Sequence, residues 1–132
     1  WGAGVAIVPF VNWTTELANV DPNVRQTDIA IMGDPAENKA LYADRSPINF
    51  IDRIKAPLLL LAGGNDPRCP ATEAQQVAAA IKKNGGFVQL KIYENEGHSF
   101  SRIETLKDAY QRVSDFLKVR VPSPGCGCSI YE

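Results

Sequence analysis

Residues 56–70 read APLLLLAGGNDPRCP, and residues 87–100 read FVQLKIYENEGHSF. Each stretch starts with an apolar run of strand length and ends in a loop that carries one residue suited to acid–base chemistry. These residues are Asp66 and His98, and His98 is the only histidine in the chain. The segment between the two stretches has helical spacing, so the pattern predicts a strand–helix–strand unit whose two strands run parallel.

The two predicted strands differ in their expected burial. Residues 58–62 are apolar on both faces, which is typical of a central strand in a parallel sheet. Residues 87–93 alternate apolar and polar side chains, which predicts a strand nearer the edge. Gly63 and Gly64 follow the first strand, where we expect them to allow a sharp turn.

The N-terminal third of the chain predicts one more strand and a helical excursion. Residues 4–9, GVAIVP, are almost all apolar and predict a third buried strand. Helix formers and breakers then alternate, so we expect short helices over residues 14–20, 22–32 and 36–43, and a helical turn after Ser46-Pro47. The fold class is therefore α/β, with about three parallel strands flanked by helices.

The C-terminal segment predicts a long amphipathic helix that ends near residue 119. Ser101 and Glu104 have the spacing of a capping box at its start. Its predicted buried face consists of Leu106, Ala109, Tyr110, Val113, Phe116 and Leu117. We expect residues 1–119 to form the domain, and residues 120–132, rich in turn formers, to be a flexible tail.

Composition narrows the possible partners. Of the 132 residues, 45% are hydrophobic and 22% are charged, and the formal net charge is -1, so we expect neither nucleic acid nor membrane as a partner. Three cysteines imply no disulfide framework, which favours a reducing, cytoplasmic location. The sequence gives no sign of a cofactor, and no cluster of four ligands suggests a metal site.

Functional residues are expected where parallel strands end, because ligands bind at that edge of an open α/β sheet. Alone, Asp66 before a proline is more typical of a turn than of a catalytic site, and a loop histidine fits either interpretation equally well. Together, on neighbouring loops, Asp66 and His98 form the acid–base part of a catalytic triad. Phe10 and Trp13 follow the first strand, where a pocket and a core position are equally good interpretations.

The segments LLLLAGGNDPRCP and EGHSF, with SPINFIDRIKAPLLLL ahead of them, resemble the end of the catalytic domain in the prolyl oligopeptidase family. The likeness runs from residue 1 to about residue 118 and is greatest to the acylaminoacyl-peptidase and dipeptidyl-aminopeptidase branches. It implies the C-terminal portion of an α/β-hydrolase fold and a serine peptidase that cleaves short or N-blocked peptides without a cofactor.

The resemblance also assigns roles to single residues. Asp66 matches the triad acid and His98 the triad base. Phe10 and Trp13 match positions that line the pocket for the residue before the scissile bond. Cys69 matches a wall position that is often valine. The neighbouring Arg68 is more typical of a solvated surface charge, and we include it as a candidate for the same pocket.

One part of the family pattern is missing. The family carries its serine in a Gly-x-Ser-x-Gly-Gly elbow ahead of the strand that matches residues 4–9, and no Gly-x-Ser-x-Gly occurs here. We therefore expect a part of a longer protein, inactive alone, whose exposed strand edge is covered in a homo-oligomer or by an exchanged segment. Two alternatives stay open, a carboxylesterase of the same superfamily and a non-catalytic interaction module.

Overall fold

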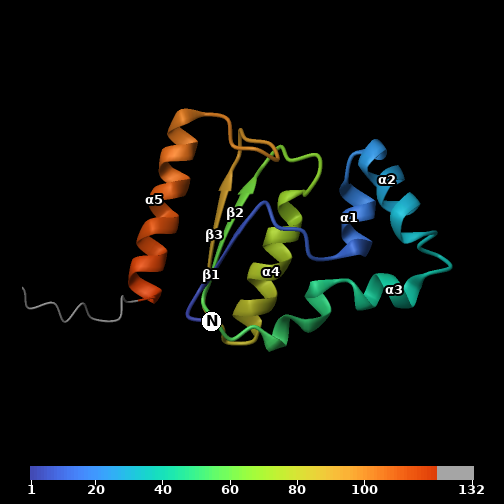
Figure 1. Cartoon of the computed structure of the whole chain (residues 1–132), viewed down its shortest axis with the longest axis horizontal. Helices are drawn as coiled ribbons and strands as arrows, with labels where there is room; N and C mark the ends of the chain where they lie inside the picture. The colour runs from blue at the N-terminus through green and yellow to red at the C-terminus, as the bar shows by residue number, and fades with distance from the viewer. Residues whose placement is uncertain (122–132) are drawn as a thin grey trace, which may run out of the picture.

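The computed structural model describes residues 1–121 and shows a three-stranded parallel sheet in the order β1-β2-β3 (Figure 1). The strands are β1 (Gly4–Ile7), β2 (Leu58–Gly63) and β3 (Val88–Tyr93). The central place of β2 and the edge place of β3 confirm the prediction from their burial patterns. Residues 122–132, where we predict a tail, lie outside the described part of the chain.

The register of the sheet decides where the functional loops emerge. Leu58 pairs with Val88 at one end of β2 and β3, and Gly63 pairs with Tyr93 at the other end. Both strands therefore end at the same level, and the loops that follow them leave the sheet side by side. On its other side, β2 pairs with β1.

Six helical segments accompany the sheet within residues 1–121. They are α1 (Trp13–Asn19), α2 (Pro22–Met32), α3 (Lys39–Asp44), the 3₁₀ segment η1 (Pro47–Arg53), α4 (Ala71–Lys83) and α5 (Ile103–Arg120). In Figure 1, α4 and α5 flank the sheet on opposite sides, and α1 to α3 form a group beyond α4. None of the helices in residues 1–121 combines the length and hydropathy needed to cross a membrane.

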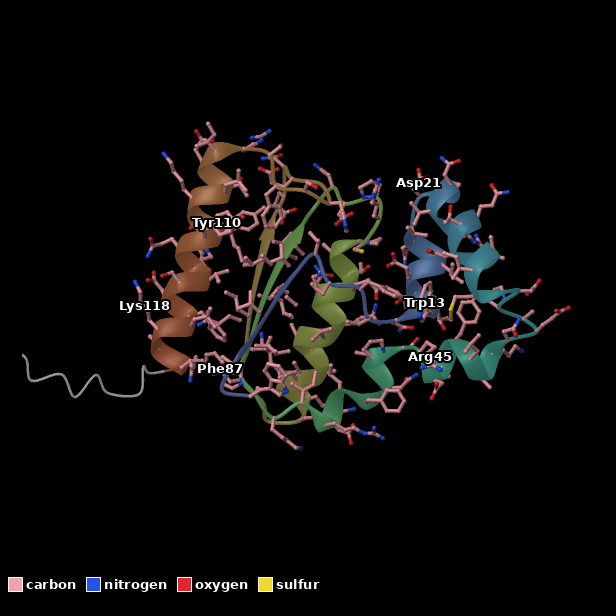
Figure 2. All side chains as sticks on the ribbon, in the orientation of Figure 1. Trp13, Asp21, Arg45, Phe87, Tyr110 and Lys118 are labelled. Carbon is pink, nitrogen blue, oxygen red and sulfur yellow. The ribbon has the colours of Figure 1, made fainter. Side chains whose placement is uncertain are left out.

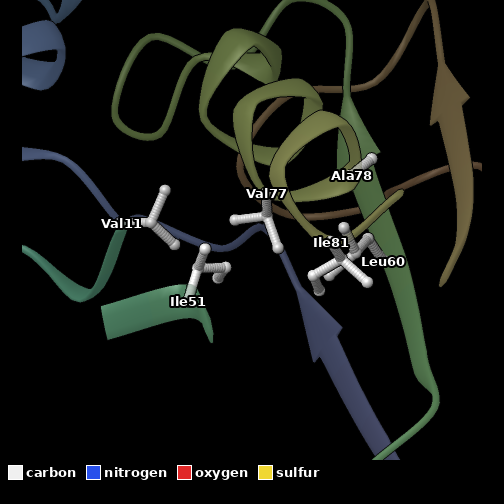
Figure 3. Close-up of a cluster of buried hydrophobic side chains, with 6 residues drawn as sticks. All are labelled: Val11, Ile51, Leu60, Val77, Ala78 and Ile81. Carbon is white, nitrogen blue, oxygen red and sulfur yellow. The ribbon is translucent and has the colours of Figure 1, made fainter. Parts of the chain in front are cut away.

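The alternation of side chains along β2 builds a core on each face of the sheet. Leu60 packs on the α4 face, in a cluster of Val11, Ile51, Leu60, Val77, Ala78 and Ile81 (Figure 3). Leu59 and Leu61 point to the α5 face and pack with Tyr93, Ala109 and Phe116. Each of these leucines is almost completely buried, which contributes about 1.5–3 kcal/mol per side chain.

The predicted buried face of α5 is wrong in part. Ala109 and Phe116 are buried as predicted, but Tyr110 is 67% exposed and Leu117 is 37% exposed. Tyr110 points toward the side of the sheet where β1 is the last strand among residues 1–121 (Figure 2), so nothing in the described chain covers this part of α5. What covers the open edge of β1, a second copy or an exchanged segment, stays a prediction.

Gly63 and Gly64 let two loops approach one another closely. A Cβ atom on Gly63 would collide with the carbonyl oxygen of Gly97 and lie 2.6 Å from that of Glu96. Neither Gly63 nor Gly64 has a positive φ, so their role is close approach more than the sharp turn we expected. A 2.9 Å hydrogen bond from the backbone nitrogen of Asn65 to the carbonyl oxygen of Glu96 joins the two loops.

Replacing Gly63 by alanine should therefore force the two loops apart. We expect Gly63→Ala to lower the free energy of unfolding by about 1–3 kcal/mol or more, as overpacking does elsewhere. Gly97→Ala is the matched control, because its Cβ would meet nothing closer than 3.8 Å. Urea denaturation of the intact protein measures both, and equal losses in the two variants would contradict the close-approach explanation.

Candidate active site

Asp66 and His98 meet above the carboxyl ends of β2 and β3. The Nδ1 atom of His98 lies 3.0 Å from Oδ2 of Asp66. The Asp66 side chain is fully buried, while 35% of the His98 side chain is exposed. A carboxylate can only accept hydrogen bonds, so this contact selects the tautomer with the proton on Nδ1 and leaves Nε2 free to take a proton.

The other oxygen of Asp66 is held by the backbone that follows it. Oδ1 accepts hydrogen bonds from the backbone nitrogens of Arg68, at 2.8 Å, and Cys69, at 2.9 Å. These two amides fix the plane of the carboxylate and direct Oδ2 toward the imidazole. The structure therefore brings Arg68 and Cys69 to Asp66 through their backbones, and the Arg68 side chain is exposed.

The loop that carries His98 is closed by a buried carboxylate on Glu96. Its oxygens accept from the backbone nitrogens of Ser101, at 2.8 Å, and Arg102, at 3.2 Å. Chiefly through the hydrogen bond from the backbone of Ser101, this arrangement lowers the pKa of the Glu96 carboxyl. The predicted capping box at Ser101 and Glu104 is wrong, because Arg102 is the N-cap and makes no side-chain capping bond.

Phe10 and Trp13 lie together at the start of α1. Their rings are edge-to-face with centroids 4.6 Å apart, and Trp13 makes a second edge-to-face contact with Tyr42 of α3 at 5.9 Å. Figure 2 shows Trp13 within the group of helices α1 to α3. A cavity of about 690 Å³ between α1, α2 and α3 is lined by Asn12 and Tyr42, but by none of the predicted pocket residues. The pocket role of Phe10 and Trp13 stays a prediction.

Glu16 is an unusual carboxyl close to this site, which sequence reasoning missed. It is 3% exposed, and its Oε2 atom has no hydrogen-bond partner in the described part of the chain. Burial first, and then the charges of Glu73, Asp28 and Asp66, raise the pKa of Glu16 to about 8. Glu16 is therefore predominantly protonated at neutral pH.

Cys69 is the only described cysteine near the acid–base pair, and its environment keeps it unreactive. Burial, followed by the charge of Glu16, raises the pKa of the Cys69 thiol to about 12. A thiol attacks as its thiolate, so Cys69 cannot replace a missing serine as nucleophile at neutral pH. Within residues 1–121, no group of three or more histidine, cysteine or acidic side chains is arranged to hold a metal ion.

The parallel sheet of this chain, with a buried aspartate and a histidine meeting at its strand-end loops, is the C-terminal part of an α/β-hydrolase fold. The pattern of the prolyl oligopeptidase family matches residues 1–121. The chain therefore belongs to the prolyl oligopeptidase family, as the sequence predicts.

The relatives are peptidases. The chain is 34% identical over 120 residues to dipeptidyl aminopeptidase BIII of Pseudoxanthomonas mexicana, which covers 87% of this chain and 17% of that protein. It is 28% identical over 127 residues to the acylamino-acid-releasing enzyme of Homo sapiens, covering 92% of this chain and 17% of the enzyme.

Solved structures agree in fold. The acylaminoacyl peptidase of Pyrococcus horikoshii matches with a TM-score of 0.81 and 25% identity, over 91% of this chain and 20% of that one. A puromycin-hydrolyzing peptidase of Mycobacterium tuberculosis matches with a TM-score of 0.82 at 22% identity, over 91% of this chain and 18% of that one. The chain thus spans about a fifth or less of the length of these proteins.

The buried carboxyl of Glu16 predicts a pH dependence of stability. Its pKa is about 8 in the folded protein and near 4.5 when exposed, so the unfolded state loses its proton first as pH rises. The stability contributed by protonated Glu16 is complete below about pH 4.5 and is lost as pH rises through about 8. We expect Glu16→Gln, which cannot ionise, to lose less stability than wild type over this range.

Thermal denaturation of the intact protein at pH 5 and at pH 8.5 measures this difference. Glu37→Gln is the control for removal of one exposed carboxylate. If Glu16→Gln and wild type lose the same stability between the two pH values, Glu16 is not a buried protonated acid.

Proposed function

We propose that this chain supplies the acid and the base of the catalytic triad of a serine peptidase. One observation carries the proposal: His98 Nδ1 lies 3.0 Å from a buried Asp66 oxygen, and the other oxygen of that carboxylate is held by two backbone amides. Membership of the prolyl oligopeptidase family and the peptidase names of its relatives support it.

The mechanism follows from the free Nε2 atom of His98. Nε2 takes the hydroxyl proton of a serine while the serine oxygen attacks the carbonyl carbon of the scissile bond. Asp66 stabilises the imidazolium that forms, and His98 then gives the proton to the departing amine nitrogen. The acyl-enzyme that remains is hydrolysed by water, which His98 activates in the same way.

The serine has to come from outside these 132 residues, because they contain no Gly-x-Ser-x-Gly. We propose accordingly that the chain alone is inactive and that the intact protein is the enzyme. Without the serine and the donors that stabilise the oxyanion, the acid–base pair has no hydroxyl to activate.

The proposed substrates are short or N-blocked peptides, in line with the names of the relatives. Phe10, Trp13, Arg68 and Cys69 are the proposed lining of the pocket for the residue before the scissile bond. The edge-to-face pair of Phe10 and Trp13 offers an apolar surface, which suits an apolar side chain at that position.

Substitution of the acid–base pair tests the proposal in the intact protein. We expect Asp66→Asn to lower kcat for a blocked peptide anilide about 10⁴-fold, because the imidazole then takes the wrong tautomer. His98→Ala should remove activity to at least the same extent, with little change in folding by circular dichroism. Asn95→Ala, an exposed position in the same loop, is the control and should keep wild-type turnover. Normal turnover by His98→Ala would refute the proposed role.

The geometry of an Asp–His pair serves ester as well as amide cleavage, so the esterase alternative needs its own measurement. We expect the intact protein to hydrolyse a blocked peptide anilide at a kcat/KM comparable with that of the matching ester. Hydrolysis of the ester alone would favour a carboxylesterase. A gene with no upstream Gly-x-Ser-x-Gly would favour the non-catalytic interaction module.

A further inference from the structure

A second buried carboxylate holds the segment that carries Phe10 and Trp13. Glu73, on α4, is fully buried. Its Oε2 atom accepts hydrogen bonds from the backbone nitrogens of Val11, at 3.2 Å, and Asn12, at 2.9 Å. The two amides lie between the two aromatic residues, so the carboxylate supports the backbone from which both rings extend.

The other oxygen of Glu73, Oε1, also accepts two hydrogen bonds. Oε1 accepts from the hydroxyl of Thr15, at 2.6 Å, and from the side-chain nitrogen of Gln76, at 3.0 Å. The side-chain nitrogen of Asn12 in turn donates to the side-chain oxygen of Gln76, Oε1, at 2.9 Å. Four donors thus converge on one carboxylate, two from the backbone before α1, one from α1 and one from α4, and they fix its position and offset the cost of burying it.

Other contacts also hold the Phe10–Trp13 segment, because Val11 is buried in the α4-side core and its carbonyl oxygen accepts a 3.1 Å hydrogen bond from the backbone nitrogen of Ile48. β1 ends at Ile7, and Val8 has a φ of 48°, which is rare for a β-branched residue and turns the chain away from the sheet. The backbone nitrogen of Trp13 donates to the buried hydroxyl of Ser46, at 3.0 Å. Glu73 is the one charged group that the structure shows bonded to this segment.

The same short stretch of chain also presents the catalytic acid. Asp66 is held by the amides of Arg68 and Cys69, and α4 begins at Ala71, so Glu73 lies in the first turn of α4. Residues 66–73 therefore reach His98 at one end and the Phe10–Trp13 segment at the other.

From this arrangement we infer that Glu73 is a positioning residue that fixes the Phe10–Trp13 segment relative to the Asp66–His98 pair. It thereby sets selectivity for the residue before the scissile bond. The inference rests on the proposed function, because it assumes that Phe10 and Trp13 line the pocket. Glu73 does not touch the substrate, and it acts only through the backbone that it holds.

Three variants of the intact protein test the inference. Glu73→Ala removes all four acceptor contacts. Glu73→Gln keeps one oxygen for the amides of Val11 and Asn12. Its new amide group can donate to the Thr15 oxygen, but it can no longer accept from Thr15 or from Gln76. Thr15→Val keeps the carboxylate but removes the hydroxyl, with its contacts to Glu73, to the Asn12 carbonyl oxygen and to the Gln76 side chain, and it is the milder variant if Glu73→Ala fails to fold. Gln75→Ala, exposed on the same helix, is the matched control.

The substrates are two blocked peptide anilides that differ only in phenylalanine or alanine before the scissile bond, and an acetate ester with no such side chain. For Glu73→Ala we expect a rise of about 10- to 100-fold in KM for the phenylalanine substrate, the effect of losing two buried amide partners. Ester turnover should stay within about twofold, and Glu73→Gln should restore most of the loss. Equal losses on all three substrates, or no loss, would overturn the inference.

Hydrogen exchange measured by mass spectrometry separates this inference from the proposed function. We expect faster exchange of the amides of residues 10–13 in Glu73→Ala, smaller acceleration in Thr15→Val, and protection close to wild type in Glu73→Gln. If wild type cleaves no substrate, the proposed function fails, but hydrogen exchange still shows whether Glu73 holds the backbone of residues 10–13. Unchanged exchange in Glu73→Ala or, if that variant does not fold, in Thr15→Val would show that Glu73 does not position the segment.

Discussion

The close contact between the loops after β2 and β3 is the constraint on which the site depends. Gly63 has no room for a Cβ atom, because the carbonyl oxygens of Glu96 and Gly97 occupy that space. Only a backbone without a side chain lets the Asp66 loop lie directly against the loop of His98. The parallel register brings the ends of β2 and β3 level, and Gly63 lets the two loops that follow lie in contact. A short aspartate side chain can therefore reach the imidazole.

Several buried carboxyl groups hold the loops at the carboxyl end of the sheet. The hydrogen-bond donors around each carboxyl group determine how well it tolerates a negative charge. Asp66, Glu73 and Glu96 each accept at least two backbone amide hydrogens, which replace the water lost on burial. Glu16 has an oxygen with no such partner in the described chain, and its pKa rises to about 8. The proton on Glu16 keeps one more negative charge away from Asp66.

The sequence predicts the parts of the fold that depend on local patterns. The apolar run of β2, the alternation in β3 and the polarity of parallel strands are enough to place Asp66 and His98 on one edge. The supports are not predictable in this way. Glu73 lies 62 residues from Val11 and accepts from backbone amides, which leave no mark on the sequence. The exposure of Tyr110 likewise depends on what packs beside β1. The helical pattern of α5 carries no information about that neighbour.

Most contacts that shape the acid–base pair come from residues 63–102, although the backbone nitrogen of Asp21 also donates to the carbonyl oxygen of Pro67, at 2.9 Å. The amides that hold Asp66, the Asn65 hydrogen bond between the loops and the Glu96 carboxylate lie within this range. The geometry of the proposed base is therefore set largely by this stretch, and the proposed enzyme needs both a hydroxyl at Nε2 and donors for the oxyanion from outside it. On the open side of β1, a cavity of about 220 Å³ is lined by Ile7 and Tyr110 together with His98. Apolar surface beside a strand edge that is unpaired within residues 1–121 favours a cover, so we expect a strand or helix there, and His98 borders the space that it would fill.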